Sequence, residues 1–215
     1  MDYKSQLTAA GVRMKKSGLT VETWGNISLC DRSRELVYIT PSGMDYDTIV
    51  AEDIVVMDLE GKVVEGFRKP SIEVPMHTAI YRSRSDVSAI IHTHPIYSTV
   101  FSSMGEDIPV IHDEGAQALN CEAVRTAAYA LPGTGELAKN CVQALGAEAN
   151  ACLLMSHGAV CVSETLEGCF KVATVLEMMA QIYQLIRSTG GSYVPISSEN
   201  IKIMCNFAKT QYGQR

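Results

Sequence analysis

Ile91-His92-Thr93-His94-Pro95 continues a short, apolar, β-branched run and predicts a strand that ends in two histidines. The run at 87–91 is typical of a buried strand. Because side chains alternate across a strand, His92 and His94 should point to the same side and could grip one ion. Pro95 cannot continue a strand ladder and suits the start of a helix. The stretch therefore predicts half of a divalent-metal site at a strand end.

A third ligand must come from elsewhere, because catalytic zinc usually takes three protein ligands and keeps one position open. The best candidate is His157, in Met155-Ser156-His157-Gly158. It sits in the turn that ends a second predicted buried strand at 151–155, before a glycine that permits tight backbone geometry. A lone His-x-His pair is common in proteins, so the metal prediction requires that these histidines converge.

Glu73 is the candidate for a fourth ligand. It lies in Lys69-Pro70-Ser71-Ile72-Glu73-Val74-Pro75, where Ser71 is expected to cap a helix that continues to about Arg82. Glu73 then falls in the first turn of that helix. The helix dipole alone favours a carboxylate there, so the residues by themselves leave a purely structural role open.

The composition predicts one cytoplasmic domain that spans residues 1–215. Of the 215 residues 47% are hydrophobic, enough for one well-buried core. The net charge of -6 argues against a nucleic-acid partner held by phosphate neutralisation. The seven cysteines show no Cys-x-x-Cys pattern and the first residues show no signal-peptide character, so we expect reduced thiols. No apolar run reaches the roughly 20 residues of a membrane-spanning helix, so no membrane partner is expected.

Helix and strand patterns mix along the chain without a regular repeat. Helices are predicted at 2–17, 71–82, 95–104, 135–145, 165–188 and 198–210, and strands at 27–30, 36–40, 54–58, 62–65, 87–94, 108–111, 151–155 and 159–162. The strands at 54–58 and 62–65 look like a hairpin. Residues 115–130 fit neither pattern. The mixture predicts an α/β fold with a largely antiparallel or mixed sheet, and not a regular doubly wound one.

Three turns that leave predicted strands have a polar character suited to phosphate. They are Trp24-Gly25-Asn26-Ile27-Ser28, Thr40-Pro41-Ser42-Gly43 and Pro70-Ser71. Backbone N–H groups in such turns, together with Ser, Thr and Asn side chains, can hold a phosphate without a dedicated lysine. Taken singly, each is more often an ordinary turn.

In combination, these motifs resemble the class II aldolase and adducin family. The motifs in the family's order and spacing are Gly25-Asn26-Ile27-Ser28, Thr40-Pro41-Ser42-Gly43, Lys69-Pro70-Ser71-Ile72-Glu73, His92-Thr93-His94 and Ser156-His157-Gly158. The resemblance runs from about Leu7 to Tyr212-Gly213 and is strongest to aldolases of L-fuculose 1-phosphate and related sugar phosphates. It implies a three-layer α/β/α sandwich, a Zn²⁺ cofactor with Mn²⁺ or Co²⁺ as alternatives, and a homotetramer with active sites at subunit interfaces.

The resemblance also implies roles for individual residues. The implied metal ligands are His92, His94, His157 and Glu73, and Glu73 is also the implied catalytic acid and base. The implied phosphate pocket consists of Gly25, Asn26, Ser42, Gly43 and Ser71. Tyr212 resembles a catalytic C-terminal tyrosine that reaches a neighbouring subunit's site, although its spacing from Phe207 is wider than in the family.

The implied reaction is the reversible cleavage of a short ketose 1-phosphate, similar to L-fuculose 1-phosphate, into dihydroxyacetone phosphate and an aldehyde. A dication held by neutral imidazoles would stabilise the negative charge that develops on the substrate oxygens. Glu73 would act as the base beside the reacting carbon, and the polar turns would anchor the phosphate end. Two positions depart from the fuculose-phosphate aldolases, which have a tyrosine in place of Asp113 and a second phosphate-binding serine in place of Ile72.

Other activities use the same scaffold. L-ribulose-5-phosphate 4-epimerase is the nearest alternative, but that branch typically has an aspartate in place of Glu73. Sugar-phosphate decarboxylases and dehydratases are further alternatives. A non-catalytic, adducin-like scaffold is disfavoured because all four implied metal ligands are present. His77 and His112 are expected to be structural, although His77, one helical turn after Glu73, could support that residue.

Overall fold

The computed structural model describes residues 2–212, and an eight-stranded sheet runs through it. The strand order is β4-β3-β2-β1-β5-β10-β9-β8, and neighbouring strands are antiparallel except β8 and β9, which are parallel. Its strands are β1 (Asn26–Asp31), β2 (Leu36–Ile39), β3 (Val55–Asp58), β4 (Val63–Glu65), β5 (Ala89–Thr93), β8 (Thr126–Ala127), β9 (Ala151–Leu154) and β10 (Gly158–Ser163). A second, short sheet pairs β6 (Ile108–Pro109) with β7 (Ala123–Val124). Gly213, the last residue of the family resemblance, lies outside the described residues.

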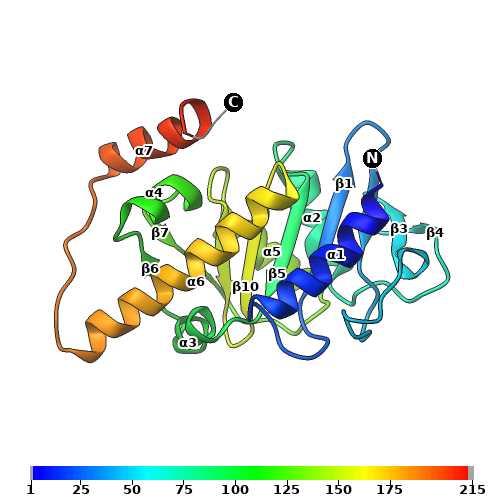
Figure 1. Cartoon of the computed structure of the whole chain (residues 1–215), viewed down its shortest axis with the longest axis horizontal. Helices are drawn as coiled ribbons and strands as arrows, with labels where there is room; N and C mark the ends of the chain where they lie inside the picture. Colours follow the sequence, from blue (N-terminus) through cyan, green and yellow to red (C-terminus); the bar gives the residue numbers. More distant parts are fainter. Residues whose placement is uncertain (1, 213–215) are drawn as a thin grey trace.

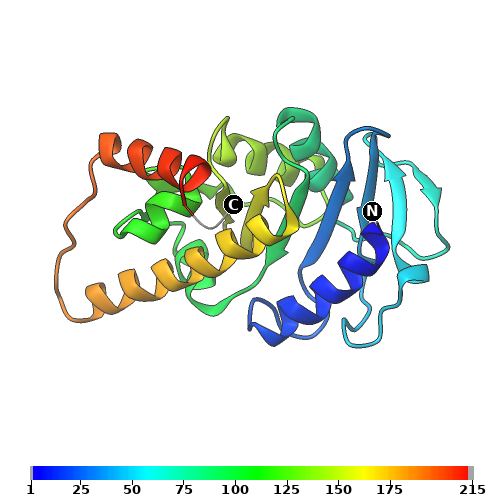
Figure 2. The same ribbon diagram turned by 45° about the horizontal axis from the view of Figure 1, so that its top comes forward.

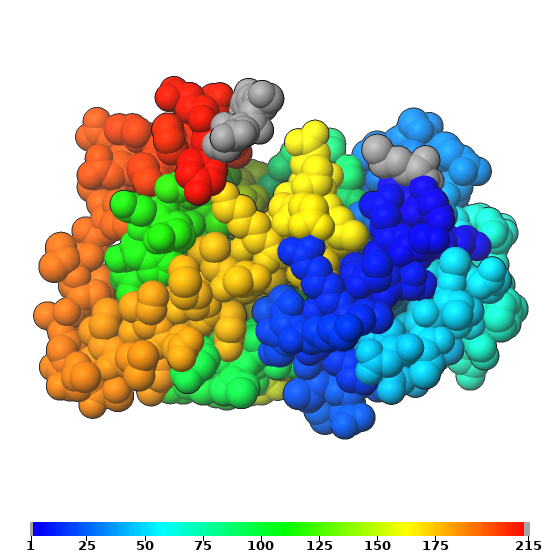
Figure 3. All heavy atoms as spheres, in the orientation of Figure 1, coloured from blue at the N-terminus to red at the C-terminus, as the bar shows by residue number. Residues whose placement is uncertain are grey.

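Helices cover both faces of the large sheet, which confirms the predicted α/β/α sandwich (Figure 1). One face carries α1 (Tyr3–Lys16), α3 (Ile96–Met104), α4 (Asp113–Leu119), α6 (Leu166–Ser188) and α7 (Ser198–Thr210), and the other carries α2 (Val74–Ser83) and α5 (Gly135–Leu145). Figure 2 shows the long α6 crossing the sheet beside α1. The surfaces of these two helices touch in Figure 3, where α1 is blue and α6 is yellow to orange. Arg13 of α1 forms an ion pair with Glu167 of α6 at 2.7 Å. A 3₁₀ turn at Ala51–Asp53 precedes β3.

The alternation of strand side chains produces two hydrophobic cores, one on each face. In β5, Ala89 and Ile91 are buried in the core under α1 and α6, whereas Ile90 is buried in the core under α2 and α5. The same period of two turns His92 toward the α2 side. The strand pattern read from the sequence therefore also decides which helix faces the histidine pair.

Most predicted elements are confirmed, and the differences have local causes. The helix expected from Ser71 begins at Val74, with Glu73 as its N-cap residue, because Pro75 favours the first turn and Ser71 instead forms a tight turn of its own. Strand β5 ends at Thr93, one residue before His94. The ambiguous segment 115–130 contains most of α4 and the short β7 and β8, which tertiary pairing stabilises more than any local pattern.

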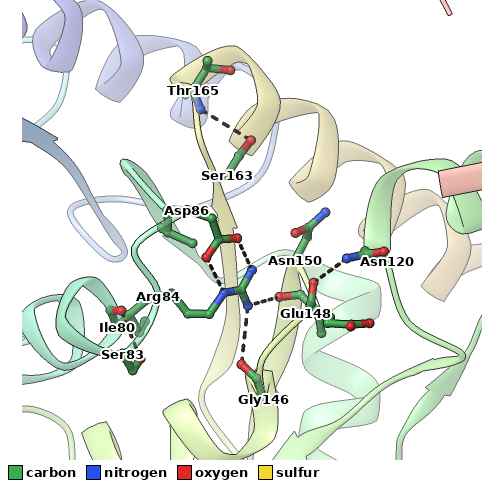
Figure 4. Close-up of polar contacts among 12 residues, drawn as sticks. Ile80, Ser83, Arg84, Asp86, Asn120, Gly146, Glu148, Asn150, Ser163 and Thr165 are labelled. Carbon is green, nitrogen blue, oxygen red and sulfur yellow. Dashed lines mark hydrogen bonds and ion pairs between the residues drawn. The ribbon is translucent and has the colours of Figure 1, made fainter. Parts of the chain in front are cut away.

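A buried arginine fixes the far end of α2 (Figure 4). Arg84, only 6% exposed, forms an ion pair with Asp86 at 2.7 Å. Its Nη1 donates to the backbone carbonyls of Gly146 at 3.4 Å and Ala149 at 3.0 Å. Because these carbonyls follow α5, Arg84 ties the end of α2 to the end of α5. Glu73 lies at the other end of α2, so this contact helps to fix the helix that carries it.

No helix within residues 2–212 combines the length and hydropathy needed to cross a membrane.

Candidate metal centre

Three imidazoles converge at the ends of β5 and β9. The Nε2 atom of His92 lies 2.9 Å from that of His94 and 3.3 Å from that of His157. The candidate ligand atoms of the three residues all lie within 4.8 Å of one another. Zn–N bonds of about 2.0–2.1 Å in tetrahedral geometry separate two ligand nitrogens by about 3.3 Å. The predicted convergence of these histidines is confirmed.

A backbone contact determines which nitrogen of His92 faces the cluster. The Nδ1–H of His92 donates to the carbonyl oxygen of Ala159 at 3.0 Å, which leaves Nε2 unprotonated in the neutral ring. Burial, and after it the neighbouring imidazoles, lowers the pKa of His94 to about 3. Burial likewise lowers the pKa of His157 to about 4. At neutral pH the rings of His94 and His157 are therefore unprotonated and available as metal ligands.

Glu73 adds a carboxylate that has no hydrogen-bond donor of its own. Its Oε2 lies 3.2 Å from Nε2 of His92, and its Oε1 lies 3.7 Å from Nε2 of His157. The residue is 2% exposed, and neither oxygen has a hydrogen-bond partner among the described residues. A neutral imidazole whose Nε2 is unprotonated cannot neutralise this charge, and an uncompensated buried carboxylate is costly. A divalent cation among three nitrogens and one oxygen removes both problems, so these residues fit a metal of the zinc type.

A cavity of about 470 Å³ opens beside the cluster. It is lined by His92, His94, His157 and Glu73 together with the whole predicted phosphate set, Gly25, Asn26, Ser42, Gly43 and Ser71. The two turns that carry Ser42 and Ser71 are tied to each other, because the N–H of Ser42 donates to Lys69 O at 3.0 Å and that of Ser71 to Thr40 O at 3.2 Å. Residues far apart in sequence thus form one concave surface next to the candidate metal ligands.

Gly25 lies at the tightest backbone contact of the site. Its φ is +72°, and a Cβ at this position would lie 2.5 Å from the carbonyl oxygen of His92. Relief would require β1 to move away from β5, because Asn26 pairs directly with His92 in the sheet. Glycine at this position is therefore needed for both its backbone conformation and its lack of a side chain.

We expect Gly25→Ala to lower the metal content of purified protein at least several-fold and to destabilise the fold by about 1–3 kcal/mol, as overpacked sites do. Metal analysis and thermal unfolding measure the two effects. Gly18→Ala is the matched control: Gly18 has a φ of +68° but no atom within 4 Å of the added Cβ. The control should share the backbone strain and keep its metal, and equal metal loss in both variants would contradict the proposed contact.

Two residues that the sequence singled out, Tyr212 and Asp113, lie away from the cluster within a single chain. Tyr212 is 59% exposed and packs against Phe207 and Lys171. It follows α7, which lies at the top of Figure 1, whereas α3, which begins two residues after His94, lies at the bottom. Asp113 is exposed in the first turn of α4.

The two remaining histidines have partners of their own. His112 caps α4, since its Nδ1 accepts from the N–H of Gly115 at 3.2 Å, which fits its expected structural role. His77 contacts the side chains of Asn26 and Ser28, and not the carboxylate of Glu73. The helical spacing allowed His77 to support Glu73, but in the structure its ring contacts Asn26 instead.

Four further residues line the cavity although no site role was predicted for them individually: Thr23, Trp24, Pro41 and Pro132. The indole of Trp24 stacks toward the His94 ring, with centroids 6.4 Å apart, although the residue is 58% exposed. Its position directly before Gly25 was an available signal. Pro132 had no local signal, because a loop far along the chain brings it to the cavity.

Comparisons with known proteins agree on one family. The model of the class II aldolase and adducin N-terminal domain matches residues 5–184. A 5-deoxy-D-ribulose 1-phosphate aldolase of Bacillus thuringiensis serovar kurstaki is 38% identical over 187 residues, which cover 87% of this chain and 86% of that protein. A 5-methylthioribulose-1-phosphate/5-deoxyribulose-1-phosphate aldolase of Rhodospirillum rubrum is 39% identical over 166 residues, or 77% of this chain and 73% of that protein. A solved structure of an L-fuculose 1-phosphate aldolase superposes with a TM-score of 0.92 at 40% identity and covers 97% of this chain and 96% of that one.

Proposed function

The chain belongs to the class II aldolase and adducin family, and we propose that it is a metal-dependent aldolase that cleaves a ketose 1-phosphate into dihydroxyacetone phosphate and a short aldehyde. The observation that carries this proposal is the meeting of three imidazole nitrogens and an unpartnered, buried carboxylate beside a cavity lined by polar turns. That combination holds a Lewis-acid site, a proton carrier and an anion site within one concave surface.

The proposed cofactor is Zn²⁺, with Mn²⁺ or Co²⁺ as alternatives. His92, His94, His157 and, before substrate binds, Glu73 would hold it. Three neutral imidazoles leave the dication charge undiminished, which suits a catalytic site better than thiolates would. When bound, the ion would supply Lewis-acid stabilisation of the negative charge that develops on the substrate's oxygens during cleavage.

The chain's own residues would divide the remaining work. Gly25, Asn26, Ser42, Gly43 and Ser71 bind the phosphate and so orient the sugar. Cleavage breaks the C3–C4 bond, the C4 hydroxyl loses its proton and C4 becomes the aldehyde carbon. The electron pair of the broken bond stays with the three-carbon fragment. Glu73 takes up a proton in exchange for the one that the C4 hydroxyl releases, and gives it to C3 to complete dihydroxyacetone phosphate. In the direction of synthesis Glu73 removes that proton from C3.

The far end of the substrate is proposed to be a methyl-bearing carbon. Trp24, Ile72 and Pro132 add apolar surface to the cavity, and Ile72 is 61% exposed. 5-Deoxyribulose 1-phosphate is the first candidate, because both curated relatives described above bear that substrate in their names. Its cleavage yields acetaldehyde. L-Fuculose 1-phosphate, which the sequence resemblance favours and which would yield lactaldehyde, is the second candidate.

Tyr212 is proposed to act in a neighbouring copy of the chain, where its hydroxyl would move the proton of the C4 oxygen. Its exposure and its distance from the cluster of its own chain support a role in another subunit. We therefore also propose a homotetramer with sites at subunit interfaces. A cytoplasmic location is proposed because all seven cysteines are unpaired thiols.

A product assay tests the proposal directly. The zinc-loaded enzyme is incubated with 5-deoxyribulose, fuculose, rhamnulose and xylulose 1-phosphates, and dihydroxyacetone phosphate is measured with a coupled dehydrogenase. We expect release of dihydroxyacetone phosphate from 5-deoxyribulose 1-phosphate with a kcat/KM at least 10-fold above that for xylulose 1-phosphate. The terminal hydroxyl of xylulose 1-phosphate would lose its hydration against the apolar surface of the cavity. No product from any of the four, together with interconversion of ribulose 5-phosphate, would replace the aldolase proposal by the epimerase alternative.

A further inference from the structure

A chain of four side chains lies under the proposed phosphate pocket. His77 and Tyr81 stand one turn apart on α2, and Asn26 and Ser28 alternate on β1, so both pairs face each other across the α2 side of the sheet. The phenol oxygen of Tyr81 lies 2.7 Å from Oγ of Ser28, which lies 2.6 Å from Nδ1 of His77. Nε2 of His77 in turn lies 2.5 Å from Oδ1 of Asn26. All four residues are buried, and His77 is 0% exposed.

The donors in this chain can be assigned from its two ends. At one end the Asn26 carbonyl oxygen only accepts, so the Nε2 of His77 must carry the proton and donate it. Nδ1 of His77 is then an acceptor, and Ser28 donates to it. At the other end, Ser28 is the one hydrogen-bond partner of the Tyr81 hydroxyl among the described residues, so Tyr81 donates to Ser28.

The reverse direction would leave a buried group without a partner. It needs the Asn26 amide turned over so that its NH₂ donates to His77, with His77 donating to Ser28 and Ser28 to Tyr81. The phenol proton of Tyr81 would then have no acceptor, although burial raises the pKa of that phenol and keeps it protonated. An unmet buried donor is costly, so the direction from Tyr81 toward Asn26 is favoured.

The direction of these hydrogen bonds determines which atom of the Asn26 amide faces the cavity. With its Oδ1 held by His77, Asn26 turns its NH₂ group away from the helix, and no residue among those described accepts from it. Asn26 lines the cavity together with Ser42, Gly43 and Ser71. The opposite amide orientation would present an oxygen to the anion and repel it.

We propose that His77 is a positioning residue that, with Ser28 and Tyr81, holds the Asn26 amide so that its NH₂ donates to the substrate phosphate. The role rests on the proposed phosphate pocket but not on the cleavage step. It explains why a histidine is fully buried on α2 although its ring does not contact the carboxylate of Glu73, the proposed metal ligand. Without these contacts the Asn26 amide could rotate about its terminal bond, and part of the binding free energy of the phosphate would be lost in ordering it.

Two substitutions of His77 separate its two hydrogen bonds. His77→Gln places an NH₂ near the former Nε2 and keeps the donation to Asn26. His77→Asn reaches only as far as Nδ1, so it keeps an acceptor for Ser28 and loses the donation to Asn26. A purely structural role would make the shorter and the longer amide comparably harmful, whereas the positioning role predicts that the glutamine variant rescues function.

The first readout is steady-state cleavage by the zinc-loaded enzyme. We expect His77→Asn to raise the KM for the ketose 1-phosphate about 10- to 100-fold, the loss typical of one hydrogen bond to a charged group, with kcat changed less than about 3-fold. His77→Gln should stay within about 3-fold of wild type in KM. Equal KM values for the two variants would overturn the proposal, as would a fall in kcat alone.

The second readout does not require cleavage. Calorimetric titration with glycerol 3-phosphate, which has no carbonyl group and cannot be cleaved, should show the same order of affinity: wild type and His77→Gln above His77→Asn. If wild type cleaves no ketose phosphate but keeps this order, the proposed reaction fails and the positioning role stands. If cleavage is normal and glycerol 3-phosphate binds all three proteins equally, the proposed reaction stands and the positioning role fails.

A third variant covers the case in which His77→Asn does not fold. Ser28→Ala removes the link that fixes the proton on Nε2 of His77 while keeping the ring in place. We expect a several-fold weaker affinity for glycerol 3-phosphate with unchanged zinc content. Unchanged affinity in a folded Ser28→Ala protein would also overturn the proposal.

Discussion

Glu73→Gln should leave a folded, metal-loaded protein that has lost at least about 10³-fold in kcat. Glutamine has the size and shape of glutamate, so the packing at the start of α2 is preserved. It cannot carry the proton that the reaction must place on C3, and general acid–base groups contribute about 10²- to 10⁴-fold. The loss should appear in kcat, because the phosphate pocket does not include this side chain's oxygens.

Single-turnover cleavage and metal analysis measure the two halves of this expectation. An exposed glutamate in the first turn of α7 provides the control, and Glu199→Gln should have wild-type kinetics. Retention of normal kcat in Glu73→Gln would refute the proposed acid–base role. Loss of metal together with activity would instead make the carboxylate chiefly a ligand.

Removal of the metal should have the second large effect, on both activity and stability. A chelator should lower the rate of cleavage by more than about 10³-fold, because no lysine or arginine is among the described residues that line the cavity and could replace the charge of a divalent cation. It should also lower the melting temperature. Without the ion the carboxylate of Glu73 stays buried with no hydrogen-bond donor among the described residues.

The stability effect has an internal control. In Glu73→Gln the buried charge is absent, so chelation should lower the melting temperature less than it does in wild type. Readdition of Zn²⁺ should restore wild-type activity, and His94→Ala should not recover, since it lacks one of the three nitrogens. If the chelator does not change the melting temperature of the wild-type protein, no metal occupies this cluster.

Sequence patterns anticipated the parts of this site that depend on local rules. The β-branched run before His92 indicated a buried strand, and the period of two placed His92 and His94 on one side. Gly25 and the hydroxyl-bearing turns were recognised because tight turns restrict which residues they accept. The order and spacing of these short motifs indicated the family, although each motif alone is weak.

Only the tertiary structure shows which residues that are far apart in the sequence contact each other. The sequence placed Glu73 inside a helix, whereas the fold makes it the N-cap residue with both oxygens turned toward His92 and His157. His77 was equally able to serve Glu73 or the core, and only the pairing of β1 beside α2 directs it to Asn26. Local backbone preferences determine strands and turns, but the partner of a buried polar group is chosen by the packing of elements that the sequence keeps tens of residues apart.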